Sequence, residues 1–252
     1  MLTIITITKD DLTGLKRTIL STQKLRMSYD IIQIIIDSSN IDIHQNINGY
    51  IQEEINTKLY YQEAQGISLA FNCGVNVSNN EWLWFLNSGD EIHPDLDLDL
   101  FMKIINVSTA DIIFFRIEFI NPKKPKDSFL SNQPSFLKIW FPIYDWHTHP
   151  GSLIQKSKFL ECGQFDTKLK IAMDTDLWFK AFAHDYKVDL ISLVIAKFYM
   201  GGISSNAPET YRELDIIMGR YFFVAIKILV NKFVRLLREW IFYKRARRWF
   251  KP

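Results

Sequence analysis

The chain has 252 residues, of which 48% are hydrophobic and 23% are charged. This composition is typical of a folded protein with one sizeable core and excludes global disorder. The formal net charge is only +2, which argues against a nucleic-acid-binding protein. The two cysteines, Cys73 and Cys162, lack metal-ligand spacing and fit a reducing compartment.

The start of the chain carries no targeting pattern. Met1 and Leu2 lead directly into a β-branched run, without the basic start and cleavage site of a signal peptide. No uninterrupted apolar run is long enough to span a bilayer. We therefore expect a cytoplasmic protein, and the sequence leaves open whether it also contacts a membrane surface.

The first half of the chain alternates predicted strands with predicted helices. Runs of β-branched and aromatic residues predict buried strands at 3–8, 29–36, 58–61 and 82–86. Apolar residues at helical spacing predict helices at 12–23 and 67–77, and the polar stretch 41–54 is interpreted as a loop that runs into a helix. A β-α-β order of this kind predicts a parallel sheet with helices on both faces.

The second half is predicted to contain strands at 110–119, 152–154 and 189–196. Its predicted helices are 95–107, 156–162, 172–184 and a helical region from 208 to the end. A stretch rich in Pro and Lys, 121–135, is predicted to be an exposed loop. We expect an α/β domain over 1–206 and a helical extension over 207–252.

Polar residues follow the predicted strand 82–86 at once. Asn87, Ser88 and Gly89 have turn chemistry, and Asp90 and Glu91 add two carboxylates just past the strand. Ligands of open α/β sheets bind at the carboxyl ends of strands, and carboxylates there can hold a hard cation and, through it, a diphosphate. An ordinary strand exit with an Asx turn gives the same pattern, so this stretch alone leaves both interpretations open.

Several short motifs follow one another in an order that resembles the family 2 glycosyltransferases. They are Thr6-x-Thr8, Asp37-Ser38-Ser39, Glu63-x-x-Gly66 with Asn72-x-Gly74, Asn87-Ser88-Gly89-Asp90, and Asp174-x-Asp176-Leu177-Trp178. The resemblance covers roughly residues 2 to 206 and is nearest to bacterial transferases that build capsule, O-antigen or colanic-acid-like polysaccharides. It implies a GT-A fold, a Rossmann-like α/β fold with a mostly parallel central sheet. It also implies a nucleotide-binding half over 1–91 and an acceptor-binding half over 92–206.

The resemblance implies a nucleotide-sugar donor, with uridine diphosphate as the default carrier. The residues that it assigns to donor binding are Thr6, Thr8, Asp37, Gly66, Asn72, Asn87, Asp90 and His149. Asp37 ends its strand where an acid commonly binds the ribose of a nucleotide. For Thr6, plain β propensity explains the residue at least as well. Phe71 stands where the family often has a basic residue, so one donor contact is absent or comes from elsewhere.

Asp90 is the residue that we expect to bind a divalent metal, Mg²⁺ or Mn²⁺. Mg²⁺ commonly takes one or two carboxylates together with phosphate oxygens and water. The family's fuller motif has acids where this chain has Asn87 and Gly89. Metal dependence therefore stays open, as does any contribution from Glu91.

Asp174 is the expected catalytic base, in the position of the last acid of the family's paired-acid motif; the residue before it is Met173. Asp176 is assigned to acceptor binding, and the alternative is an acid that stabilises a helix N-terminus. Trp146 is also assigned to acceptor binding through stacking on a sugar ring, with core packing as an equal alternative. His147 and His149 form an H-x-H pair, but no third zinc ligand lies nearby in the sequence.

The end of the chain, residues 226–251, combines apolar and basic residues and has one acid, Glu239. The pattern predicts a basic amphipathic helix on an anionic membrane surface, which suits a polyprenyl-linked saccharide acceptor and a location on the inner face of the cell membrane. Packing on the domain and a homodimer contact are the alternatives.

We therefore expect an inverting glycosyltransferase that transfers a sugar from a nucleotide-diphosphate donor to a saccharide or lipid-linked saccharide in surface polysaccharide synthesis. The alternative is a non-catalytic relative that binds a nucleotide or saccharide and serves as an assembly partner. A nucleotidyltransferase is disfavoured because residues 9–14, after the first strand, lack a glycine-rich loop with basic residues. No nucleic-acid partner is expected.

Overall fold

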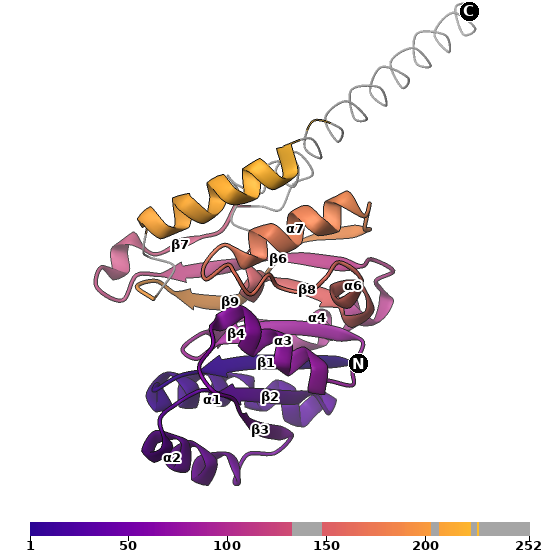
Figure 1. Ribbon diagram of the computed structural model, residues 1–252. Coiled ribbons are helices and arrows are strands. Elements are labelled where there is room, and N and C mark those ends of the chain that lie inside the picture. The colour runs from indigo at the N-terminus through magenta and orange to yellow at the C-terminus, as the bar shows by residue number, and fades with distance from the viewer. Residues whose placement is uncertain (133–147, 203–206, 223–225, 227–252) are drawn as a thin grey trace, which may run out of the picture.

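The computed structural model describes residues 1–132, 148–202, 207–222 and 226. Within these residues, nine strands form one curled sheet in the order β3-β2-β1-β4-β8-β6-β9-β5, with β7 paired to β6. Figure 1 shows the N-terminal elements at one end of the molecule and β6, α7 and the last described helix at the other, and the pairing of β4 with β8 joins the two parts of the sheet. The expected α/β class is confirmed.

The first half forms the parallel part of the sheet. Its elements are β1 (Leu2–Thr8), α1 (Leu12–Tyr29), β2 (Ile32–Asp37), α2 (Ile41–Ile51), β3 (Thr57–Tyr61), α3 (Ile67–Val77) and β4 (Trp82–Asn87). The four strands are parallel, and their register places Thr8 beside Asp37 and Ile7 beside Asn87. The polar residues that end these strands therefore lie along one edge of the sheet.

In this half, the predicted end of the first helix and the predicted start of the second strand are both wrong. Helix α1 continues to Tyr29, past the predicted end at residue 23, and β2 begins only at Ile32. The physical reason is Arg26, which is fully buried and donates to Ile19 and Glu54, so the last turn of the helix is stabilised by tertiary contacts. Asp30 then ends the helix with a φ of 52°.

The second half adds antiparallel strands and completes the curl. Its elements are β5 (Glu91–Ile92), α4 (Leu98–Val107), β6 (Ile112–Ile120), η1 (Pro125–Asp127), β7 (Phe129–Leu130), η2 (His149–Gly151), β8 (Ser152–Gln155), α6 (Lys156–Glu161), α7 (Met173–Ala183) and β9 (Val188–Tyr199). Strand β8 is antiparallel to both β4 and β6, whereas the long strand β9 is parallel to β6. The longest ladders are parallel, so the sheet is mostly parallel, as expected.

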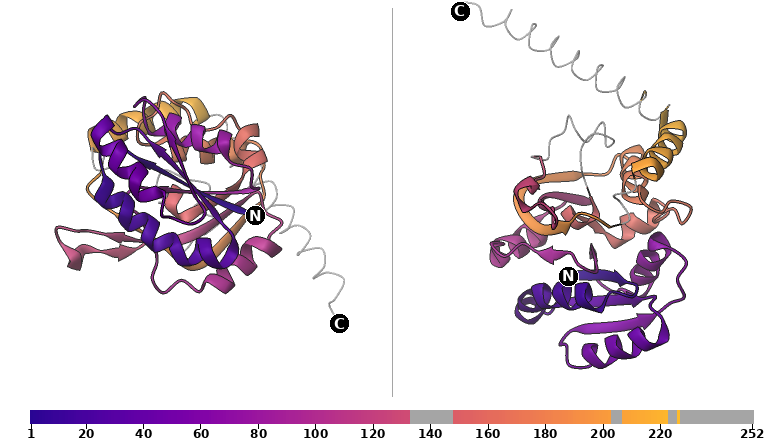
Figure 2. Two further views of the ribbon diagram at one scale, coloured as in Figure 1. Left: turned by 90° about the horizontal axis from the view of Figure 1, so that it is seen from below. Right: turned by 90° about the vertical axis from the view of Figure 1, so that its left-hand side faces the viewer.

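The predicted exposed loop 121–135 contains more structure than expected. Its described part holds η1 and the short strand β7, which pairs with the end of β6. Phe129 stacks on Phe119 with ring centroids 4.9 Å apart, which stabilises this pairing. The hairpin extends away from the rest of the sheet (Figure 2).

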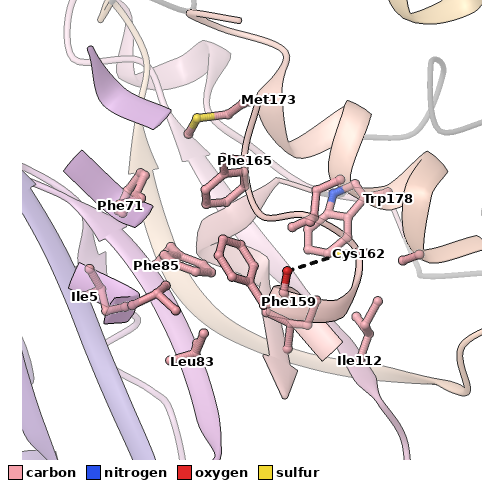
Figure 3. Close-up of a cluster of buried hydrophobic side chains, with 14 of the residues drawn as sticks. Ile5, Phe71, Leu83, Phe85, Ile112, Phe159, Cys162, Phe165, Met173 and Trp178 are labelled. Atoms are coloured by element: carbon pink, nitrogen blue, oxygen red, sulfur yellow. Dashed lines mark hydrogen bonds between the residues drawn. The ribbon is translucent and has the colours of Figure 1, made fainter. Parts of the chain in front are cut away.

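Alternate residues of the central strands fill two separate cores. On one face, Ile5 and Phe85 pack with α3, α6 and α7, and on the other face Ile4 and Trp84 pack with α4. Figure 3 shows the first core, in which the rings of Phe71, Phe85, Phe159 and Phe165 lie against one another. This aromatic cluster packs α3 and α7 against the central strands.

Residues 207–222 form a helix, called here the C-terminal helix, that packs on α7. Ile217 is fully buried, and the ring of Tyr221 stacks on Phe179 with centroids 5.3 Å apart and an interplanar angle of 1°. The first part of the predicted extension is therefore packed against the α/β domain. Of the tail 226–251, all but Ile226 lies outside the described residues. In the described ranges, no helix is long and apolar enough to cross a bilayer.

Candidate active site

Strand β4 ends in a tight turn that carries two of the predicted residues. The Asp90 N–H donates to the Asn87 carbonyl over 3.1 Å, and Gly89 has a φ of +98°, which residues with a side chain rarely adopt. Helix α1 holds the back of the turn: Thr18 Oγ1 accepts from the Gly89 N–H over 2.9 Å, and Arg17 Nη2 donates to the Gly89 carbonyl over 2.8 Å. These contacts fix where Asp90 lies.

Asp90 is almost completely buried, with 3% of its surface exposed. Its Oδ2 accepts from the Asn87 N–H over 2.9 Å and from Asn87 Nδ2 over 3.1 Å. Burial raises the pKa of Asp90 to about 6, against the opposing effects of nearby His149 and of the two bonds from Asn87. A bound cation would therefore stabilise the ionised form of Asp90, which burial disfavours.

His149 connects the β4 turn to α7. Its Nε2 lies 2.9 Å from Asn87 Nδ2, and because an amide nitrogen only donates, Nε2 is the acceptor and Nδ1 carries the proton. Nδ1 lies 3.5 Å from Asp174 Oδ2, but it is buried and makes no hydrogen bond within the described residues. The ring packs edge-on against Phe71, with centroids 5.4 Å apart.

Asp174 lies in the first turn of α7 and points its carboxylate toward His149. Its Oδ1 accepts from the Thr175 N–H over 2.8 Å, and 14% of its side chain is exposed. The fold thus brings Asn87, Asp90, His149 and Asp174 into one continuous chain of contacts. This is the candidate active site, with one carboxylate at each end.

A second group of predicted residues lies at the ends of β1 and β2. Asp37 is fully buried, and its Oδ1 accepts from the Ser39 N–H over 2.9 Å while its Oδ2 lies 2.6 Å from His44 Nδ1. Thr8, beside it, is 5% exposed. Because both carboxylate oxygens of Asp37 have protein partners, His44 and the adjacent Tyr61 present the accessible surface here.

Two residues that we assigned to donor binding lie in the core. Thr6 is fully buried under α1, where its Oγ1 accepts from Gln33 Nε2 over 3.0 Å. Asn72 donates to the Phe165 carbonyl over 2.9 Å and accepts from the Phe165 N–H over 3.1 Å. Their side chains are committed to packing and to protein hydrogen bonds, so we remove both from the candidate donor site.

Asp176 is also inaccessible to a substrate. It is fully buried between α7 and the C-terminal helix, within 2.8 Å of Lys180 Nζ, 3.3 Å of Arg220 Nη1 and 3.1 Å of the Tyr221 hydroxyl. The assignment to acceptor binding is therefore corrected to a role in helix packing. The physical reason is that Asp176 projects from a different face of α7 than Asp174.

The other assigned residues are placed as follows. Gly66 precedes α3 with a φ of +108°, a conformation that favours glycine. Gly74 allows close packing of α3 on β1, since a Cβ there would lie 2.3 Å from Ile5 Cγ2. Trp146, assigned to acceptor binding, and His147 lie outside the described residues. Phe71, which stands where the family often has a basic residue, belongs to the core, and its ring packs against that of His149.

Sequence reasoning missed Arg17, Thr18, His44 and Glu213. Arg17 and Thr18 act on the β4 turn from about seventy positions away in the chain. His44 had a weak local signal, because it lies seven positions after Asp37 at the start of α2. Glu213 had none, because its partners are backbone groups more than forty positions away.

The donor set suits a metal only in part. Among the described residues, no group of three or more His, Cys, Asp or Glu side chains could hold a metal ion. Asp90 by itself matches the pattern in which one carboxylate binds Mg²⁺ and substrate phosphates and water complete the coordination shell. Asp90 would thus hold a metal only together with a phosphorylated ligand.

The family model described as "Glycosyl transferase family 2" matches residues 3–165. The chain belongs to this family. Its similar curated relatives include an uncharacterized glycosyltransferase of Methanocaldococcus jannaschii, 25% identical over 66% of this chain and 58% of the relative. Another, from Rickettsia prowazekii, is 28% identical over 61% of this chain and 52% of the relative. The chain spans little more than half the length of these relatives.

Solved structures with the same fold include TarS of S. aureus. TarS superposes with a TM-score of 0.64 at 16% identity, covering 86% of this chain and 38% of TarS. Its fragment 1–349, solved with UDP-GlcNAc, gives a TM-score of 0.63 at 15% identity, covering 81% of this chain and 60% of the fragment. The fold of this family 2 member is thus the expected GT-A fold.

Proposed function

We propose that this family 2 member is an inverting glycosyltransferase that uses a nucleotide-diphosphate sugar. The observation that carries the proposal is the contact chain from Asp90 through Asn87 and His149 to Asp174, at the edge where the parallel strands end. It provides a desolvated acid suited to the diphosphate end of a donor and a second acid suited to an acceptor. The structures of TarS 1–349 with UDP and with UDP-GlcNAc support a uridine-diphosphate donor.

In the proposed reaction, Asp174 accepts the proton of an acceptor hydroxyl. That oxygen attacks the anomeric carbon as the bond from this carbon to the diphosphate oxygen breaks, so the configuration inverts. His149, with its proton on Nδ1, faces the Asp174 carboxylate and orients it. When bound with the donor, a divalent metal at Asp90 would offset the negative charge of the leaving diphosphate.

Asp37, Thr8 and His44 are proposed to form the nucleoside end of the donor site, with His44 as the exposed contact. The acceptor is proposed to be a saccharide, free or linked to a polyprenyl carrier, in bacterial surface polysaccharide synthesis. The excess of basic residues in 226–251 supports attachment to an anionic membrane surface, where such a carrier resides.

The test is donor hydrolysis and transfer by the purified full chain with a panel of nucleotide sugars, with Mn²⁺ and with chelator. We expect release of one nucleoside diphosphate, lowered at least 100-fold by Asp174→Asn and by Asp90→Ala, because each removes a charge that acts in the transition state. The matched control is Asp95→Asn, an exposed acid five positions past Asp90. It is expected to retain wild-type rates.

The non-catalytic alternative is favoured by Gly89 and Met173, which stand where family members often have acids. It predicts that UDP binds but that no donor is hydrolysed or transferred, whatever the acceptor mixture offered. Turnover that depends on Asp174 would exclude this alternative. Absence of both binding and turnover would contradict the transferase proposal.

A further inference from the structure

Glu213 makes an unusual contact with the chain that leads into α7. It is 2% exposed, and its carboxylate accepts from three consecutive backbone N–H groups. These are Lys170 over 2.7 Å, Ile171 over 2.9 Å and Ala172 over 2.8 Å. Asp174, the proposed base, follows two positions later, in the first turn of the helix.

The chemistry of these bonds requires a carboxylate. The N-cap residue of α7 is Ala172, and the three N–H groups that Glu213 binds belong to this residue and to the two before it, so they need an acceptor from outside the helix. A carboxylate has only acceptors and can take all three bonds. A carboxamide of the same shape would turn an NH₂ group toward the donors. Glu213 thus binds, from the C-terminal helix, the backbone segment that leads into α7.

Further contacts join the C-terminal helix to α7 and to the loop before it. Arg220 Nη1 lies 2.6 Å from Asp166 Oδ2, and the Tyr221 hydroxyl donates to Asp176 Oδ1 over 3.1 Å. Tyr221 also stacks on Phe179. On the approach to Asp174, Glu213 binds the backbone N–H groups of 170–172, and Ser68 donates to the Leu169 carbonyl over 2.7 Å.

We propose that Glu213 is a positioning residue for catalysis: it fixes the start of α7 so that Asp174 meets His149 and the acceptor hydroxyl. The inference rests on the proposed function, in which Asp174 is the base. It makes the C-terminal helix part of the catalytic unit, although this helix lies beyond the residues that the family model matches.

The experiment compares the full-length wild type with Glu213→Gln. Two quantities are measured: amide hydrogen exchange at 170–174, and kcat together with the donor KM. We expect exchange to accelerate at least tenfold and kcat to fall at least tenfold, with the donor KM changed less than twofold, because the proposed donor residues belong to other elements. The control is Glu209→Gln, which should change neither quantity, because this partly exposed carboxylate one turn earlier on the same helix pairs with Arg212 and not with 170–172.

Glu213→Asp is the milder variant if Glu213→Gln folds poorly, and it should give intermediate values because the shorter side chain keeps the charge. Faster exchange with an unchanged kcat would overturn the positioning role and leave only a structural one. Unchanged exchange would overturn the contact itself. A wild type that transfers no sugar would sink the proposed function and, with it, the role for Asp174, while the exchange data would still show whether Glu213 holds 170–172.

Discussion

At the scale of single residues, the site depends on a carboxylate kept out of water. Asp90 has its carboxylate pinned by two bonds from Asn87, yet burial raises its pKa to about 6. A pKa of about 6 instead of 3.8 corresponds to about 3 kcal/mol that the metal-free fold loses when Asp90 ionises. Asp90, the residue best suited to bind a cation, thus destabilises the folded chain when it is ionised and no cation is bound.

The sign of this effect gives a prediction for Asp90→Asn in the presence of chelator. At a pH well below 3.8, Asp90 is protonated in both the folded and the unfolded chain, so its ionisation contributes nothing. Between pH 4 and pH 6 only the unfolded chain ionises it, so stability falls as pH rises. We expect Asp90→Asn to raise the free energy of unfolding by up to about 3 kcal/mol at pH 7.5 and by little at pH 4.

Urea unfolding at the two pH values measures this difference. A variant whose advantage is the same at both pH values would contradict the raised pKa of Asp90. Asp95→Asn again serves as the control, because its carboxylate is exposed.

At the scale of elements, two helices of equal length show how context decides the effect of one residue type. Helices α2 and α3 each have eleven residues and an interior glycine, Gly49 and Gly74. A Cβ at Gly49 would meet nothing within 4 Å, whereas a Cβ at Gly74 would lie 2.3 Å from Ile5 Cγ2. Gly74 thus allows α3 to pack closely on β1, and the same helix carries Phe71, whose ring contacts His149.

We therefore expect opposite effects from two identical substitutions. Gly49→Ala should raise the free energy of unfolding by about 0.5–1 kcal/mol, through helix propensity alone. Gly74→Ala should lower it by about 1–3 kcal/mol, because the branched Ile5 side chain cannot move away in the packed core. Thermal and urea unfolding of both variants measure this. Equal shifts of the same sign would show that α3 packs less tightly on β1.

At the scale of the whole molecule, the C-terminal helix is tied to the α/β domain by buried contacts. Glu213 and Ile217 bury their side chains against the α7 region, and the half-buried Tyr221 stacks on Phe179. Removing them would leave three backbone N–H groups and the ring of Phe179 without these partners. The boundary that we predict at residue 206 is thus not expected to be a point at which the chain can be cut.

We predict that a chain of residues 1–206 is less stable than a chain of residues 1–226 by about 4 kcal/mol or more. The estimate combines the loss of a buried aliphatic residue with unpaired buried donors. Urea unfolding of the two chains gives the comparison. Equal stability would mean that the helix is an accessory segment, and the role inferred for Glu213 would fall with it.

Local patterns in the sequence were sufficient to predict most of the fold. The β-branched run before Thr8, the aromatic run before Asn87 and the helical spacing from Ile67 each depend on periodicity within a few residues. The turn at Gly89 and the position of Asp90 past its strand follow from the same local chemistry. The family resemblance added Asp174 and His149, whose meeting no spacing could predict.

The sequence by itself determined the α/β class, the carboxyl ends of the first four strands and the acids that stand at them, because backbone preference and side-chain alternation act over short distances. Only the tertiary structure decided which polar residues face the site and which face the core: Thr6, Asn72 and Asp176 satisfy buried neighbours, whereas Asn87, His149 and Asp174 meet. It also decided that Glu213 binds the backbone ahead of α7. The physical reason is that hydrogen bonds between distant segments depend on how the sheet curls and the helices pack, which no local pattern encodes.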